Sequence, residues 1–213
     1  GSMNVSSGAS ISSTSGFDVG VNGGFQLGNG AGGTVTVNAS GPVSIADQGS
    51  GLFTTTAGNG VGGSINLRGS AIQLSNGAAV SATSSGSGNA GNITVNAGNQ
   101  LTMSNSSITT EANQSSGGAI KIATTPSGTV QLNDSMISAS VLNGDGGGGS
   151  VNIDPQFVVL QNSQILAQAI QGAGGNISIT TNLLLPDSAS IISASSQFGQ
   201  QGSVTIQSPI APA

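Results

Sequence analysis

One five-residue pattern recurs seven times along the chain and constrains the fold more than any other feature. Each copy reads glycine, small or polar residue, apolar, polar, apolar. The apolar pairs are Val35/Val37, Ile65/Leu67, Ile93/Val95, Ile120/Ile122, Val151/Ile153, Ile177/Ile179 and Val204/Ile206. Successive copies lie about 28 residues apart, a period typical of solenoids built from stacked units.

Two further short apolar segments lie between successive copies. The second segment carries the pairs Val43/Ile45, Ile72/Leu74, Leu101/Met103, Val130/Leu132, Val158/Leu160 and Leu183/Leu185. The third segment begins with Leu52, Val80, Ile108, Ile137, Ile165 or Ile191. Alternation with period 2 is typical of strands with one buried face. The sequence therefore predicts an all-β parallel β-helix of about seven coils with three short strands each, right-handed by the connection rule for parallel strands.

A polar residue that favours turns ends the second segment of every full repeat. It lies two residues after the last apolar position, as Asp47, Asn76, Asn105, Asp134, Asn162 or Asp187. Asp and Asn tolerate the left-handed backbone region and bond their own backbone. We expect these residues to form one structural corner that repeats in register.

The repeat also predicts the domain organisation, a single solenoid domain. Residues 1–3 resemble vector-derived sequence, and residues 4–32 form a partial first coil with a long loop excursion. The β-helix repeats occupy residues 33–207, and residues 208–213 form a tail. No polar or amphipathic cap is recognisable at either end, so we expect the chain to be a fragment of a longer protein.

Composition excludes several classes of function. Charged residues make up 4% of the chain, Cys and His are absent, and the net charge is −5. Thiol chemistry, imidazole bases and zinc sites are therefore excluded. Two cations, Arg68 and Lys121, cannot neutralise a nucleic-acid backbone. No apolar run is long enough for a membrane span, and we expect no cofactor, no metal and no membrane insertion.

Several phrases resemble filamentous-haemagglutinin-type exoproteins, which are large adhesins of Gram-negative bacteria. They are Gly88–Val95 (GNAGNITV) and Leu74–Ala82 (LSNGAAVSA), while Ile153–Leu160 (IDPQFVVL), Gly175–Ile179 (GNISI) and Ser208–Pro209 are similar to the carboxy-terminal coils of such proteins. The resemblance covers nearly the whole chain. It implies a right-handed β-helix, two-partner secretion through an outer-membrane transporter, and a place outside the cell or on its surface. It also implies a role as an adhesive segment or stalk in cell adhesion or biofilm, with a receptor on a host or neighbouring cell surface, or a glycan.

A catalytic role is the first alternative, because some β-helix proteins act on polysaccharides. Asp134 and Asp187 are predicted about 10 Å apart on one corner, close to the carboxylate separation of inverting glycosidases. The repeated corner explains both residues as turn formers, so we expect no catalytic site. Sugar-binding sites commonly use aromatic side chains, and Phe157 and Phe198 are the phenylalanines of the carboxy-terminal region. We expect these two residues to pack against loops and not to bind sugar.

Ice binding is the second alternative, since some ice-binding proteins are β-helices with threonine arrays. The outward residues of the first strand do not form a regular threonine ladder, and Lys121 interrupts them.

One surface feature stands apart from the polar exterior. The alternation places four apolar side chains on the outside of the last two full coils, as Val159, Leu166, Leu184 and Ile192. Contiguous exposed apolar residues mark interaction sites. We expect this candidate interaction patch to contact a neighbouring segment or a partner.

Overall fold

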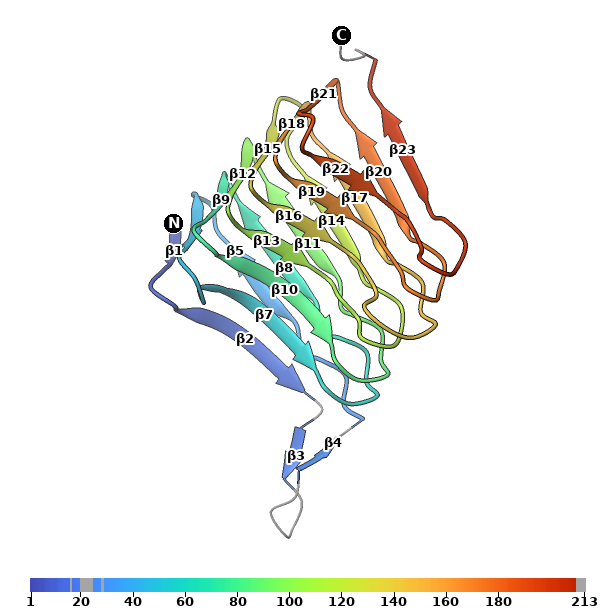
Figure 1. Cartoon of the computed structure of the whole chain (residues 1–213). Helices are drawn as coiled ribbons and strands as arrows, with labels where there is room; N and C mark the ends of the chain where they lie inside the picture. The colour runs from blue at the N-terminus through green and yellow to red at the C-terminus, as the bar shows by residue number, and fades with distance from the viewer. Residues whose placement is uncertain (16, 20–24, 28, 210–213) are drawn as a thin grey trace.

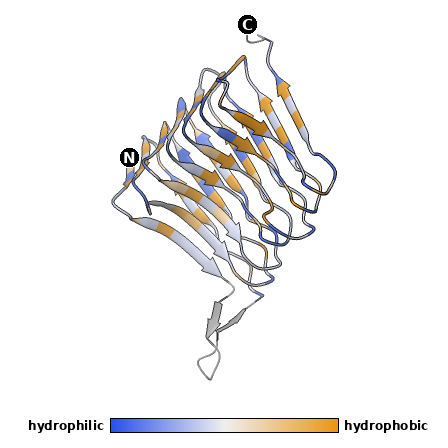
Figure 2. Ribbon diagram, viewed as in Figure 1, coloured by the Kyte–Doolittle hydropathy of each residue, from blue (hydrophilic) through white to orange (hydrophobic). Residues whose placement is uncertain are grey.

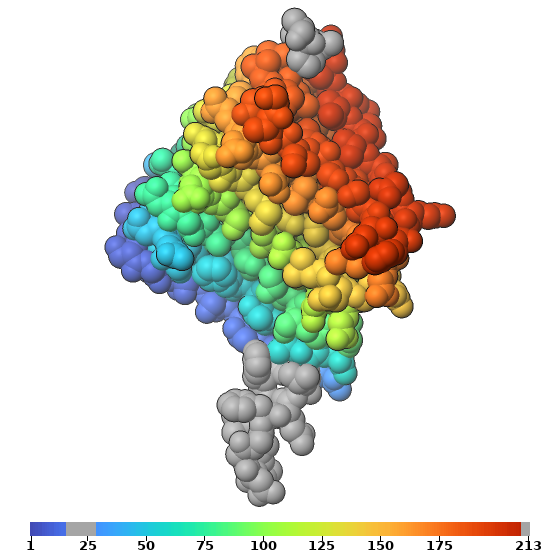
Figure 3. All heavy atoms as spheres, viewed as in Figure 1, coloured from blue at the N-terminus to red at the C-terminus, as the bar shows by residue number. Residues whose placement is uncertain are grey.

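The chain winds into a solenoid whose coils stack in sequence order (Figure 1). The computed structural model describes residues 1–15, 17–19, 25–27 and 29–209, and every regular element within them is a β-strand. The coloured bands in Figure 3 follow one another along the molecule from the amino to the carboxyl end. The predicted all-β parallel solenoid is confirmed, with about six turns of about 28 residues and three strands per turn.

Three seven-stranded parallel sheets form the walls of the solenoid. Sheet I contains β1 (Met3–Val5), β6 (Val43–Ala46), β9 (Ile72–Ser75), β12 (Gln100–Ser104), β15 (Thr129–Asn133), β18 (Phe157–Gln161) and β21 (Leu183–Pro186). Sheet II contains β2 (Ser10–Ser15), β7 (Gly51–Thr56), β10 (Ala79–Ser84), β13 (Ser107–Thr109), β16 (Met136–Ser138), β19 (Gln164–Leu166) and β22 (Ile191–Ser193). Sheet III contains β5 (Val35–Asn38), β8 (Ile65–Gly69), β11 (Ile93–Ala97), β14 (Ala119–Ala123), β17 (Ser150–Asp154), β20 (Asn176–Thr180) and β23 (Ser203–Gln207).

Equivalent residues of successive coils pair directly, so the repeat in the sequence becomes a set of columns in space. Ile65, Ile93 and Ile120 are consecutive members of one such column in sheet III. Neighbouring strands in a sheet lie about 4.8 Å apart, which sets the rise of each coil.

The core is a continuous apolar interior bounded by the three sheets. Figure 2 shows apolar positions recurring on the strands of successive coils. The side chains of Ile45, Leu74, Ile93, Leu132 and Ile153 are completely buried. Burial of one such side chain contributes about 1.5–3 kcal/mol, so aliphatic residues supply the core without aromatic bulk.

Corner I–II, which joins sheet I to sheet II, contains the predicted turn residues. Asp47, Asn76, Asn105, Asp134 and Asn162 all have positive φ angles, between 46° and 79°. The left-handed turn expected from the sequence is thus present at five of the six positions.

Corner II–III, which joins sheet II to sheet III, depends on glycine. A Cβ atom on Gly118 would lie 1.8 Å from the carbonyl oxygen of Gly91, and one on Gly149 would lie 1.9 Å from that of Gly118. The same close approach recurs along a ladder formed by Gly33, Gly63, Gly91, Gly118, Gly149, Gly175 and Gly202. The glycine of the repeated pattern is therefore required because the backbones of adjacent coils touch there.

The last coil departs from the predicted alternation by one residue. Leu184 stacks on the core residue Val158 and is 5% exposed, whereas Leu185 stacks on Val159 and is 45% exposed. The prediction that Leu184 faces outward is therefore wrong. Three consecutive leucines satisfy either alternation, and the spacing from the preceding strand decides between them.

The same offset continues through the following corner and strand. Ile192 pairs with the buried Ile165 and packs against the core, while Ile191 is 47% exposed, so the outward placement of Ile192 is also wrong. Pro186 stacks on Leu160, which brings Asp187 one position earlier in the ladder than Asn162. Asp187 accordingly lacks the positive φ of the other corner residues.

The first coil contains a short antiparallel hairpin between sheets II and III. Strands β3 (Phe17–Val19) and β4 (Phe25–Leu27) pair as an antiparallel hairpin between β2 and β5. Other parts of the predicted excursion, and the end of the predicted tail, lie outside the described residues. At the amino end, Met3 begins β1 and pairs with Val43.

Candidate functional site

The two carboxylates considered for catalysis lie on either side of one asparagine. The Asn162 side-chain amide donates a hydrogen bond to Asp134 Oδ1 (2.6 Å), and its backbone N–H donates to Asp187 Oδ2 (3.0 Å). Ser190 Oγ donates to Asp187 Oδ1 (2.6 Å), and this bond is the main reason why the pKa of Asp187 lies below its usual value. Both carboxylates therefore hold adjacent coils together at corner I–II.

A column of serines beside these residues was not recognised in the sequence. Ser106 N donates to Ser135 Oγ (3.2 Å), Ser135 N donates to Ser163 Oγ (3.1 Å), and Ser163 N donates to Ser190 Oγ (3.1 Å). Serine directly follows Asn105, Asp134 and Asn162, which is the signal that could have revealed the column. It supplies partners for backbone groups buried at the corner.

Glu111 has a carboxyl group that is partly buried on the outer side of sheet II. Burial raises its pKa, and a hydrogen bond with Ser138 acts in the opposite direction. The nearby Ser138 is itself 1% exposed, and its hydroxyl bonds that of Ser140 at 3.0 Å. These serine hydroxyls are thus already paired with each other.

The outer face of sheet III carries the residues considered for ice binding. Thr36 pairs with Asn66, and Thr94 pairs with Lys121, whose side chain is exposed. Stacked residues on this outer face therefore differ in size and charge and do not form a regular threonine array.

The candidate interaction patch is divided between two sheets. Val159 and Leu166 are half-buried on the outer faces of β18 and β19. Leu184 and Ile192 face the core, and their positions on the surface are taken by Leu185 and Ile191.

An apolar block on sheet I begins beside the patch. Phe157 pairs with Leu183, and Val159 pairs with Leu185, so four apolar side chains share the outer face of β18 and β21. The preceding strand β15 presents Thr129 and Gln131 at the equivalent positions. Phe198, by contrast, lies at corner II–III, where 74% of it is exposed, and it is not part of this block.

A groove runs along corner III–I, which joins sheet III to sheet I, in the carboxy-terminal coils. It has a volume of about 630 Å³ and is bordered by three-residue segments from four successive coils. These segments are 124–126, 154–156, 180–182 and 207–209. We call it the corner groove.

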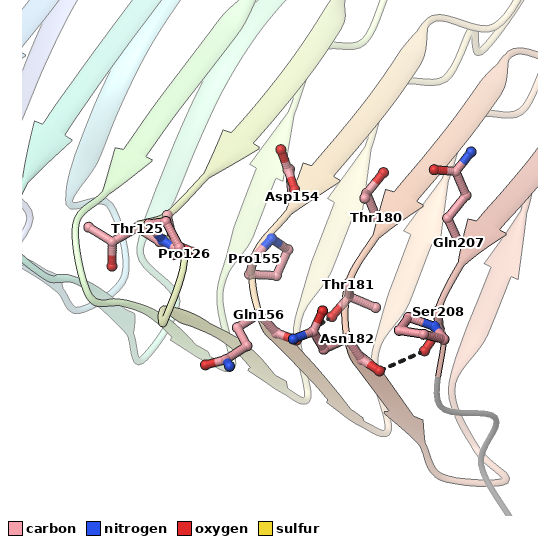
Figure 4. A pocket seen from close by; sticks show the side chains of 12 residues that line it. Thr125, Pro126, Asp154, Pro155, Gln156, Thr180, Thr181, Asn182, Gln207 and Ser208 are labelled. Carbon is pink, nitrogen blue, oxygen red and sulfur yellow. Dashed lines mark hydrogen bonds between the residues drawn. The ribbon is translucent and has the colours of Figure 1, made fainter.

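The backbone that supports the corner groove is tied together across the coils. The Gln156 carbonyl accepts hydrogen bonds from Asn182 N (2.9 Å) and Thr181 Oγ1 (2.8 Å). Ser208 Oγ donates to the Asn182 carbonyl (3.0 Å), as Figure 4 shows. Thr181 is 4% exposed, so its hydroxyl serves the corner and is not presented to solvent.

Several polar side chains that border the corner groove have no hydrogen-bonding partner within the described residues. Asp154, Thr180 and Gln207 are the last residues of β17, β20 and β23, and their side chains point the same way (Figure 4). Gln156 and Asn182 follow at the next bend. Within the described part of the chain, these five side chains make no hydrogen bond.

The other two corners contrast with the corner groove. At corner II–III, Asn59 Nδ2 donates to Asn29 Oδ1 (3.1 Å), and Asn143 Nδ2 donates to Asn113 Oδ1 (2.7 Å). At corner I–II, the Asn162 amide is bound to Asp134. Several amide side chains at those corners therefore bind neighbouring coils, whereas Gln156, Asn182 and Gln207 of the corner groove do not.

The sequence did not single out the corner groove, although it contained a signal. Val158 follows Ile153 by five residues, and Leu184 follows Ile179 by the same number. Equal corner lengths place Gln156 above Asn182 in the stack. The described residues include no group of three or more His, Cys, Asp or Glu that could hold a metal ion. They also include no helix long and apolar enough to cross a membrane.

No family model, curated protein or solved structure matches the chain.

Proposed function

We propose that the chain is a non-catalytic structural and adhesive segment of a secreted bacterial surface exoprotein of the filamentous-haemagglutinin type. The main support is the unbroken stack of three registered sheets around one apolar core. Because each coil contacts its neighbours over all three sides, bending the stack would break hydrogen bonds in several sheets together. Such a rod gives reach and stiffness to whatever it carries.

Two further observations favour a stalk with a contact surface. Asp134 and Asp187 take part in bonds between coils, which is the role of a scaffold residue. The polar side chains of the corner groove and the apolar block beside it provide a surface for contact. The receptor is proposed to lie on a host or neighbouring cell, and export is proposed to use an outer-membrane two-partner-secretion transporter.

Fractionation of the source organism tests the proposal. An antibody raised against this chain is used to probe surface, soluble and secreted fractions. We expect a surface-associated or secreted band much larger than 20.3 kDa. Fab fragments of the same antibody should reduce cell attachment or biofilm formation, while Fab fragments against an unrelated surface protein should not.

A soluble intracellular band near 20 kDa would overturn the proposal. Enzyme assays on polysaccharides and thermal-hysteresis measurements would then become the informative experiments.

A further inference from the structure

The corner groove combines three properties that together define a ligand. It is open and elongated, it presents hydrogen-bonding side chains without internal partners, and it adjoins an apolar surface that contains an aromatic ring. Its four bordering segments come from four coils, so it extends over about 14 Å, three coil steps of about 4.8 Å. Its volume falls within the usual range of ligand sites.

The chemistry of the uncommitted groups favours a ligand rich in hydroxyls. The side chains of Gln156, Asn182 and Gln207 each offer both donors and an acceptor, while Asp154 offers acceptors only. A hydroxyl group both donates and accepts, so neighbouring hydroxyls match such amide and carboxylate groups.

The charge of the groove narrows the class further. Asp154 is the one charged residue among those that border the groove. Arg68 lies in β8, two coils before β14. Lys121 lies on the outer face of β14, two residues before Ala123, which pairs with Asp154. The one cation near the groove is thus matched by the one carboxylate, and no net positive charge remains to attract an anionic ligand.

The apolar block supplies the remaining contact. Phe157 follows Gln156 directly, and Leu183 follows Asn182, so the two side chains begin where the groove opens onto sheet I. A sugar ring has an apolar C–H face that packs on such residues while its hydroxyls reach the polar groups. An extended peptide that adds to a sheet would pair along β21 or β23, the last described strands of sheets I and III. The corner groove instead runs across four successive coils, so a ligand that follows it does not lie parallel to any strand edge.

We infer that the corner groove, together with Phe157 and Leu183, is a binding site for a neutral oligosaccharide. The inference rests on the proposed adhesive function and names the ligand class through which adhesion would occur. Gln156 and Asn182 bind ring hydroxyls at the centre of the groove, and Asp154 orients the ligand from the carboxyl end of β17.

The first test uses the whole chain on an array of neutral, sialylated and sulfated glycans. We expect binding to neutral oligosaccharides and little dependence on salt. Calorimetry with the best neutral oligosaccharide then compares the wild type with the double variant Gln156→Ala/Asn182→Ala. Loss of two or more hydrogen bonds predicts a decrease in affinity of about tenfold or more.

A matched control removes the same two types of side chain next to the groove. Gln131→Ala/Asn152→Ala alters one glutamine and one asparagine on the outer faces of β15 and β17. This variant should bind as the wild type does. Circular dichroism and the thermal midpoint of each variant establish that the fold is retained, and a third variant, Asp154→Ala, provides a second measurement if the first does not fold.

Several outcomes would overturn the inference. They are the absence of binding to any neutral glycan, preference for acidic glycans or for a peptide, unchanged affinity in the groove variants, or an equal loss in the control. None of these results would move the protein from the cell surface in fractionation, so failure of the site and failure of the proposed function remain distinguishable.

Discussion

At Gly118 the close contact between coils leaves no room for any side chain. The missing Cβ would lie 1.8 Å from the Gly91 carbonyl oxygen, a backbone atom that cannot rotate away. We expect Gly118→Ala to lower the free energy of unfolding by about 3 kcal/mol or more, because two coils must separate locally. Chemical denaturation monitored by circular dichroism measures the change.

Gly147→Ala provides the control, since a Cβ there would meet its nearest atom, Ala173 O, at 3.4 Å, an ordinary contact. Its effect should stay within about 1 kcal/mol. Equal effects at both glycines would show that the ladder does not limit the approach of the coils.

Glu111 should make the stability of the chain depend on pH. Burial raises its pKa in the folded state, so the folded chain holds a proton that the unfolded chain has already released. The contribution of Glu111 to the free energy of unfolding is therefore greatest below the pKa that its carboxyl group has in the unfolded chain. It is lost as the pH rises through the pKa of that group in the folded chain. Glu111→Gln should raise the thermal midpoint at pH 7, and the difference from wild type should shrink as the pH falls.

Asp187 should make stability depend on pH in the opposite direction. The hydrogen bond from Ser190 and the one from the backbone N–H of Asn162 lower its pKa, so its contribution is present near pH 7 and is lost on acidification. Asp187→Asn should therefore lower the midpoint at pH 7. If the thermal midpoint of the Glu111 variant changes with pH in the same direction as that of the Asp187 variant, burial of Glu111 does not control the pH dependence of stability.

At the scale of the strand, a matched pair of leucines tests the register of the last coil. Leu184→Ala should cost about 2–3 kcal/mol because it removes a side chain from the core. Leu185→Ala, on the outer face of the same strand, should cost less than about 1 kcal/mol. A larger loss at Leu185 would restore the alternation that the sequence first suggested.

These leucines also show where sequence analysis reaches its limit. Elsewhere the apolar and polar residues of each strand alternate, as in Val151–Ile153, and one assignment of faces is possible. In the run Leu183–Leu185 every position is apolar, so only the length of the preceding corner decides. The strands and corner I–II could therefore be predicted from the sequence. Which leucines of the last coil face the core, and which residues form the corner groove, could be known only from how the coils stack. Side chains such as Gln156 gain significance only from neighbours 26 residues away.

At the scale of the whole molecule, the coils should be interchangeable units. Each coil contacts mainly the coils before and after it, so stability is the sum of coil terms and interface terms. Removing residues 93–119 takes out one full period and places Ile120 of β14 on Ile65 of β8, where Ile93 now lies. We expect this shortened chain to fold cooperatively, with a lower thermal midpoint and a rod shorter by about 4.8 Å.

The half-period deletion of residues 93–106 provides the contrast, because it brings strands of different sheets into one position. Beyond the deletion, the buried apolar residues of each strand would no longer stack on equivalent residues of the preceding coil. We therefore expect that chain not to fold. Circular dichroism and small-angle scattering distinguish the two variants. If both deletions unfold the chain equally, the coils are not independent units, and the stability of the solenoid depends on features that the repeat does not contain.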